Sequence, residues 1–163
     1  MSLLARSIVF SSLVAALATP AAAATHSITS GLGCVQAYGA WEAKMSYGDE
    51  GFFYSDATDW YRTAVCPLPH ASQLYGGATA TVEVLDRSYD LDVSCRIVTR
   101  SPQWVIWGAA KSSSGSNTNG QSLTVNLATG LTTGNSHVLC YLPPVYQGNR
   151  SAVVGVDATI QSL

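Results

Sequence analysis

The feature that most constrains the fold of this chain is a succession of short β-branched and aromatic runs, each interrupted by turn-forming residues. No sustained helical period of 3.6 residues follows Cys34, although residues 40–45 fit a single helical turn. Many short strands separated by Gly, Asn, Asp and Pro are typical of an all-β fold. We therefore expect an antiparallel β-sandwich of about nine strands, with jelly-roll and immunoglobulin-like topologies both open. The predicted strands span residues 35–38, 52–54, 62–68, 79–85, 91–100, 104–110, 122–128, 137–142 and 152–160.

The first 24 residues have the layout of a secretory signal peptide. Arg6 precedes a mostly apolar run over residues 7–18, and Ala22-Ala23-Ala24 forms a small-residue cleavage site. The run is shorter than the roughly 20 apolar residues that a membrane-spanning helix needs. We expect cleavage after Ala24, a flexible mature N-terminus over residues 25–33 and a single domain over residues 34–163. The mature protein is expected to be secreted or periplasmic, without a membrane attachment once the signal is removed.

The low charge of the chain excludes several kinds of partner. Charged residues make up 11% of the chain and the formal net charge is −2, well below the quarter that is usual for globular proteins. There is no basic patch for nucleic acid and no basic amphipathic helix for a membrane surface. No cofactor is predicted.

Four cysteines follow the signal segment: Cys34, Cys66, Cys95 and Cys140. An even number of cysteines in an oxidising compartment predicts disulfides, and four cysteines allow three connectivities. No C-x-x-C pair occurs, so a zinc site is the less favoured interpretation.

Four acidic residues cluster around the segment YDLDVSC, namely Glu83, Asp86, Asp90 and Asp92. Alternation along a strand over residues 91–100 would place Asp90 and Asp92 on a solvated face, with Leu91 and Cys95 toward the core. A hairpin between this strand and residues 79–85 would complete the arrangement. The alternative interpretation is a calcium site that uses all four acids, although their spacing matches no common calcium loop.

No catalytic motif is found. The chain lacks G-x-S-x-G, H-E-x-x-H and a phosphate-binding glycine loop. Its histidines, His26, His70 and His137, are not grouped with a nucleophile in the sequence. We therefore predict no catalytic residues and a non-enzymatic function.

Aromatic residues are the strongest functional hint in the sequence. Trp104 and Trp107 stand three apart in WVIWG, so a strand would turn them to opposite faces, one into the core and one available to a ligand such as a sugar ring. A group of aromatics in the first third of the mature chain is interpreted as core filling and capping. This group is Tyr38, Trp41, Tyr47, Phe52, Phe53, Tyr54, Trp60 and Tyr61. Residues 111–121, KSSSGSNTNGQ, predict a mobile polar loop.

Four segments resemble a group of uncharacterised secreted bacterial proteins. These segments are AVCPLP, VEVLDRSYDLDVSC, HVLCYLPP and the final strand SAVVGVDATI. The resemblance covers most of residues 34–160 and implies a β-sandwich with the pairing Cys34–Cys66 and Cys95–Cys140. It implies no catalytic residue.

Taken together, these features predict an exported, non-enzymatic surface or extracellular module that binds a glycan or a protein. The first alternative is a structural subunit that assembles through sheet edges, for which the final strand over residues 152–160 is the candidate edge. The second alternative, a small secreted hydrolase that uses carboxylates, is the least favoured.

Overall fold

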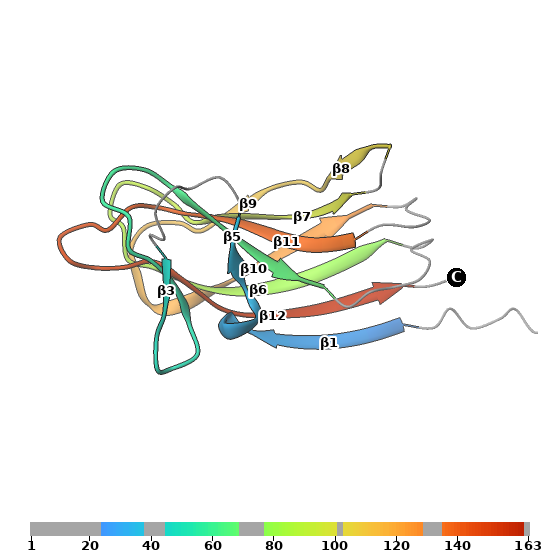
Figure 1. Cartoon of the computed structure of the whole chain (residues 1–163), viewed down its shortest axis with the longest axis horizontal. Helices are drawn as coiled ribbons and strands as arrows, with labels where there is room; N and C mark the ends of the chain where they lie inside the picture. Colours follow the sequence, from blue (N-terminus) through green and yellow to red (C-terminus); the bar gives the residue numbers. More distant parts are fainter. Residues whose placement is uncertain (1–23, 38–44, 69–76, 101–102, 129–134, 162–163) are drawn as a thin grey trace, which may run out of the picture.

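The computed structural model describes residues 24–37, 45–68, 77–100, 103–128 and 135–161. In these ranges the chain forms two antiparallel sheets that pack face to face as a β-sandwich (Figure 1). The predicted fold class is therefore confirmed. Residues 40–44 of the predicted helical turn, His70 and nearly all of the predicted signal peptide lie outside the described residues, and Met45 is the first residue of a strand. None of the described segments is a helix long and apolar enough to cross a membrane.

The first sheet has the strand order β10-β6-β12-β4-β3, and β1 pairs with β12 beside β4. Its members are β1 (Ala24–Ser30), β3 (Met45–Tyr47), β4 (Phe53–Ser55), β6 (Ala78–Asp86), β10 (Asn117–Leu127) and β12 (Ala152–Gln161). A short 3₁₀ helix, η1 (Gly31–Gly33), leads from β1 toward the other sheet.

The second sheet has the strand order β2-β5-β11-β7-β8, and β9 pairs with the start of β7. Its members are β2 (Val35–Gln36), β5 (Arg62–Pro67), β7 (Ser94–Arg100), β8 (Val105–Trp107), β9 (Lys111–Ser112) and β11 (Asn135–Leu142). All nine predicted strands are present with shifted ends, and β1, β3 and β9 are additional.

The core lies between the two sheets and follows the alternation of each strand. In β6, Ala80, Val82 and Val84 are buried while Thr79 and Glu83 are exposed. The facing strands β7 and β11 contribute Ile97, Val138 and Leu142, among others, to one continuous hydrophobic cluster. Burial of these apolar side chains is the main favourable term in folding.

Two disulfides link Cys34 to Cys66 and Cys95 to Cys140, so the predicted pairing is confirmed. Cys95 lies directly opposite Cys140 in the register of β7 and β11, and Cys34, which directly precedes β2, is joined to Cys66 on the neighbouring strand β5. Both therefore reinforce the sheet that carries the candidate site.

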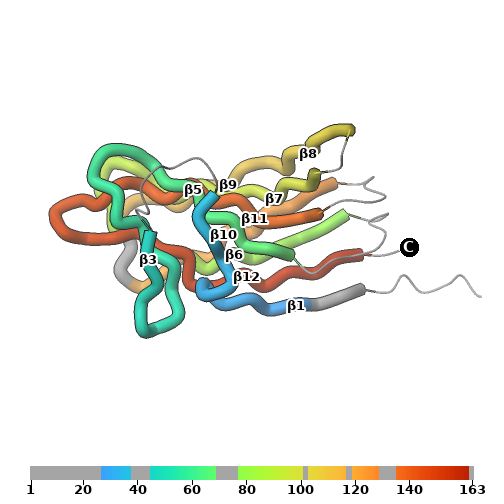
Figure 2. The backbone as a smooth tube through the Cα atoms, viewed as in Figure 1, coloured from blue at the N-terminus to red at the C-terminus, as the bar shows by residue number. Residues whose placement is uncertain are grey.

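Residues 25–33, predicted to be flexible, are instead part of the fold. Strand β1 pairs with β12 from Ala24 opposite Gln161 to Ser30 opposite Gly155, and the two strands lie side by side in Figure 2. A central strand with one unpaired side offers a complete row of backbone donors and acceptors, and β1 satisfies that row. The backbone pairing with β12 thus makes this segment a strand, although its own sequence gives only a weak strand pattern.

Strand β12 is not a free edge. It pairs with β6 on one side and with β1 and β4 on the other. The hypothesis that residues 152–160 add onto another subunit is therefore wrong, because their backbone groups already have partners.

The predicted hairpin between residues 79–85 and 91–100 is also wrong. Strand β6 belongs to the first sheet and β7 to the second, and β7 begins only at Ser94. Leu91, predicted to face the core, is 39% exposed in the connection between the sheets. The buried side chain of Asp86, described below, accepts hydrogen bonds from the connection at this crossing.

Candidate functional site

The outer face of the second sheet, on the side away from the core, carries an unusual set of side chains. Cross-strand partners share a face of a sheet, and Tyr141 pairs with Ser94, which in turn pairs with Ser112. Two residues further along β7, Arg96 pairs with Leu139 of β11. Two residues beyond that, Val98 pairs with Trp107 of β8. Arg96 therefore lies diagonally between Tyr141 and Trp107.

The guanidinium of Arg96 contacts the faces of both flanking rings. It lies 5.3 Å from the centroid of the Trp107 ring and 5.6 Å from that of Tyr141. Both distances are within the range of a cation–π interaction. The two rings thus hold the arginine on the outer face of the sheet.

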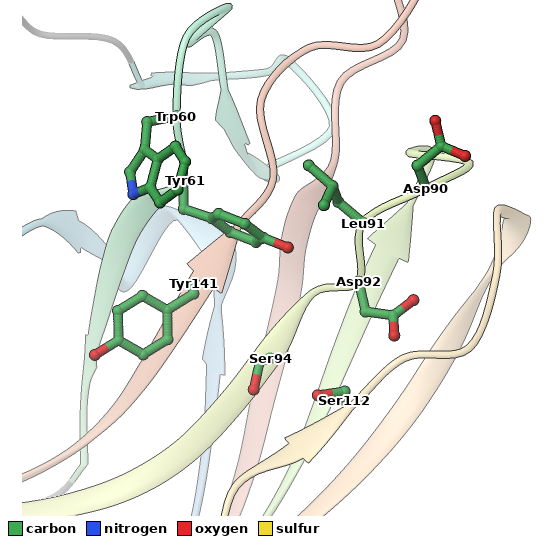
Figure 3. Close-up of a pocket in the computed structure, with 8 residues that line it drawn as sticks. All are labelled: Trp60, Tyr61, Asp90, Leu91, Asp92, Ser94, Ser112 and Tyr141. Carbon is green, nitrogen blue, oxygen red and sulfur yellow. The ribbon is translucent and has the colours of Figure 1, made fainter.

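A pocket of about 480 Å³ continues from Tyr141 toward the end of the sandwich. It is lined by Trp60, Tyr61, Asp90, Leu91, Asp92, Ser94, Ser112 and Tyr141. Figure 3 shows the three aromatic rings on one side of the pocket and the two carboxylates on the other, with the two serines between them. The pocket is open to solvent, since Trp60 is 70% exposed.

The pocket therefore offers ring faces together with hydroxyl and carboxylate oxygens. Burial raises the pKa of the Tyr61 hydroxyl, and the nearby charges of Asp92 and Asp86 raise it further. Tyr61 thus stays a neutral hydrogen-bond donor at physiological pH. A pocket of this kind can bind a polar ligand that has an apolar flat side.

Asp86 does not line the pocket, but it positions a segment that does. Its carboxylate is fully buried and accepts hydrogen bonds from the backbone amides of Ser88 and Val93, at 3.1 and 3.2 Å. It also accepts from the hydroxyls of Ser113 and Ser151. These four donors come from three separate connections, so one carboxylate positions the segment that presents Asp90, Leu91 and Asp92.

The four acids of the calcium interpretation are used in different ways. Glu83 lies on β6 in the first sheet and accepts a hydrogen bond from Ser122. Asp86 is buried in its own network, while Asp90 and Asp92 are exposed at the pocket. Within the described ranges, no three His, Cys, Asp or Glu side chains lie close enough together to hold a metal ion.

Both candidate tryptophans are exposed, so the expectation that one of them belongs to the core is wrong. Trp104 is 37% exposed and Trp107 is 52% exposed. The reason is that β8 is a three-residue edge strand in which Ile106, between Val105 and Trp107, packs against the core. Trp107 takes part in the site on the outer face, whereas Trp104 precedes β8 and does not line the pocket.

The segment over residues 111–121, predicted to be a mobile polar loop, is in large part strand. Lys111–Ser112 forms β9 and Asn117 begins β10. Ser113 is buried because its hydroxyl donates to Asp86. Ser112, its neighbour, is thereby placed at the pocket.

Several site residues were not recognised in the sequence. Trp60 and Tyr61, which the sequence predicts to fill the core, instead precede β5 and line the pocket. Tyr141 and Arg96 lie at the outward positions of predicted strands, and this alternation was the only signal available for them. None of the described histidines lines the pocket, and His137 lies on the outer face of β11, where burial and the charge of Arg100 lower its pKa.

No protein-family model matches this chain, and no curated protein matches it. Solved structures of similar shape do exist. A low-affinity xylan-binding module, CBM86, from Roseburia intestinalis matches with a TM-score of 0.51 at 12% identity, over 85% of this chain and 96% of that one.

Two further structures match almost as well. The CBM36-1 domain of a multidomain xylanase from the hindgut metagenome of Trinervitermes trinervoides has a TM-score of 0.50 at 12% identity, over 83% of this chain and 96% of that one. The xylan-binding module CBM15 has a TM-score of 0.50 at 12% identity, over 86% and 97%. The chain thus has the β-sandwich fold found in these carbohydrate-binding modules.

Proposed function

We propose that this protein is an exported, non-catalytic module that binds glycans on the outer face of its second sheet. The observation that carries the proposal is the continuous path from Trp107 over Arg96 to Tyr141 and on into the pocket of Trp60 and Tyr61. Ring faces that remain accessible on a sheet surface can stack on the apolar faces of sugar rings. The serine hydroxyls and carboxylates beside them can bind sugar hydroxyls.

The similar structures support this proposal. Three solved modules that share the fold are described as xylan-binding or as part of a xylanase. Fold alone does not determine function, so the argument depends on the aromatic path and the pocket. Export is supported by the two disulfides and by the signal-like N-terminal segment.

Membership in the group of secreted bacterial β-sandwich proteins stays a prediction. The disulfide pairing that the resemblance implies is present. A binding partner of protein nature is the second possibility raised by the sequence, but the shallow pocket with its hydroxyls favours a sugar.

The test is binding of the mature protein to a panel of insoluble polysaccharides and soluble oligosaccharides, by pull-down and by titration calorimetry. Trp107→Ala and Tyr141→Ala should each weaken binding by about 10-fold or more, as expected when an anchoring ring is removed. Tyr89→Ala is the matched control, because Tyr89 is 76% exposed but does not line the pocket. Equal affinity of all three variants and wild type would contradict the proposal, as would a failure to bind any glycan.

A further inference from the structure

Among the residues that the structure describes, the guanidinium of Arg96 forms two ring contacts but no ion pair. Two other arginines are paired: Arg62 with Asp59 and Arg150 with Asp56, each at 2.9 Å. Arg96 is thus held in the middle of the candidate binding face without an ion-pair partner among the described residues. We expect the ligand to supply an acceptor.

The chemistry of the guanidinium limits what that acceptor can be. Its planar set of donors matches the two oxygens of a carboxylate, and this bidentate pairing is among the strongest hydrogen-bonding arrangements in proteins. Trp107 and Tyr141 hold the group in place before binding, so little conformational entropy remains to be lost. A neutral sugar hydroxyl would leave most of this capacity unused.

The surrounding charges agree with an acidic ligand unit at this position. Arg100, the next outward-facing charged residue on β7, lies about 13 Å further along the strand and takes no part in the pairing proposed for Arg96. The acids nearest the site, Asp90 and Asp92, lie at the other end of the path, in the pocket. The carboxylates of the path therefore lie in the pocket, beyond Tyr141, and do not pair with Arg96.

We propose that the ligand is an acidic glycan, and that the carboxylate of a uronic acid unit pairs with Arg96 between Trp107 and Tyr141. This inference rests on the proposed glycan-binding function and names the class of glycan. Neighbouring units of the same chain would then occupy the pocket through their hydroxyl groups.

The experiment compares acids with their uncharged counterparts on the wild-type protein, so it does not depend on any variant folding. The probes are short oligomers of galacturonate, of mannuronate and of glucuronate-substituted xylose, each also prepared as its methyl ester. At least one acid should bind about 10-fold or more tightly than its own ester, and its affinity should fall with added salt.

Three variants locate the effect. Arg96→Gln should abolish the preference for acid over ester, and Arg96→Lys should keep part of it, since lysine keeps the charge but not the paired geometry. Arg100→Gln is the matched control: it removes one positive charge from the same strand at about 13 Å, beyond the screening length of physiological salt. It should retain the preference.

The outcomes separate this inference from the proposed function. Equal binding of acids and esters, or a preference that survives Arg96→Gln, would overturn the assignment to Arg96 while glycan binding itself stands. Failure of every acidic and neutral oligomer to bind would refute both proposals.

Discussion

Removing the carboxylate of Asp86 should destabilise this protein more than any other single change to an acidic residue. Asp86 is fully buried and accepts from four donors: the amides of Ser88 and Val93 and the hydroxyls of Ser113 and Ser151. Asp86→Ala would leave these donors beside an apolar methyl group. An unsatisfied buried donor costs about 1–3 kcal/mol.

The four losses would not add in full. The Val93 amide also has the Ser113 oxygen at 2.8 Å, and the Ser113 hydroxyl can turn to the Val93 carbonyl at 3.2 Å. The Ser88 amide and the Ser151 hydroxyl have no such alternative among the hydrogen bonds of the described residues. We therefore expect a loss of about 3–5 kcal/mol, a large part of the usual stability of one domain.

The assay is urea denaturation followed by tryptophan fluorescence. With a slope of about 2 kcal/mol/M, a loss of about 4 kcal/mol would lower the midpoint by about 2 M. Ser113→Ala removes one of the four donors and should cost about 1–2 kcal/mol. Asp90→Ala is the matched control, because Asp90 lies exposed on the same connection and should change stability by less than about 0.5 kcal/mol.

Two results would refute the reasoning. A cost below about 1 kcal/mol for Asp86→Ala would mean that the carboxylate does not organise the crossing between the sheets. An equal cost for Asp90→Ala would mean that the stability lies in the connection as a whole and not in the buried network.

Three other predictions concern separate parts of the molecule. Gly31→Ala should cost about 1–3 kcal/mol in urea denaturation, because a Cβ there would lie 2.5 Å from the Val153 carbonyl oxygen and 2.7 Å from that of Gly51; an unchanged midpoint would contradict this. Burial, followed by the charge of Arg100, lowers the pKa of folded-state His137 below its unfolded value of 6.5. The unfolded state therefore binds more protons below pH 6.5, and the free energy of unfolding should fall as the pH drops from 6.5 toward the lowered pKa. His137→Gln should remove that dependence from the urea midpoints, and an identical pH profile would refute the assignment. Glycan binding should persist in a calcium chelator, since the Asp86 carboxylate is already occupied by protein donors; loss of binding would restore the calcium interpretation.

The candidate site was only partly visible in the sequence. The WVIW pattern predicts that one of Trp104 and Trp107 is exposed, because it places a bulky ring on each face of a strand, but it does not identify which. The sequence does not predict the role of Arg96. An arginine on the outward side of a strand cannot be told from any solvated residue until its neighbours on other strands are known. Its neighbours Trp107 and Tyr141 come from β8 and β11, which lie on either side of β7.

The acidic segment is a second case in which the sequence does not reveal the role of each residue. Asp86, Asp90 and Asp92 are close in sequence, and the calcium interpretation places them in one site. In the structure Asp86 is buried at the crossing between the sheets, and the other two are exposed at the pocket. Burial depends on donors from residues 113 and 151, which are far along the chain, and no local pattern could have identified them.

The sequence by itself determined that this protein is a disulfide-linked β-sandwich, because strand alternation, turn residues and cysteine number are local properties that act within a few residues. Only the tertiary structure decided which strands share a sheet. That choice placed β6 and β7 in different layers, gave β12 partners on both sides, and brought Trp60, Arg96, Trp107 and Tyr141 to one face. Strand pairing is settled by contacts between segments distant in the sequence, and the binding face exists only once those contacts have formed.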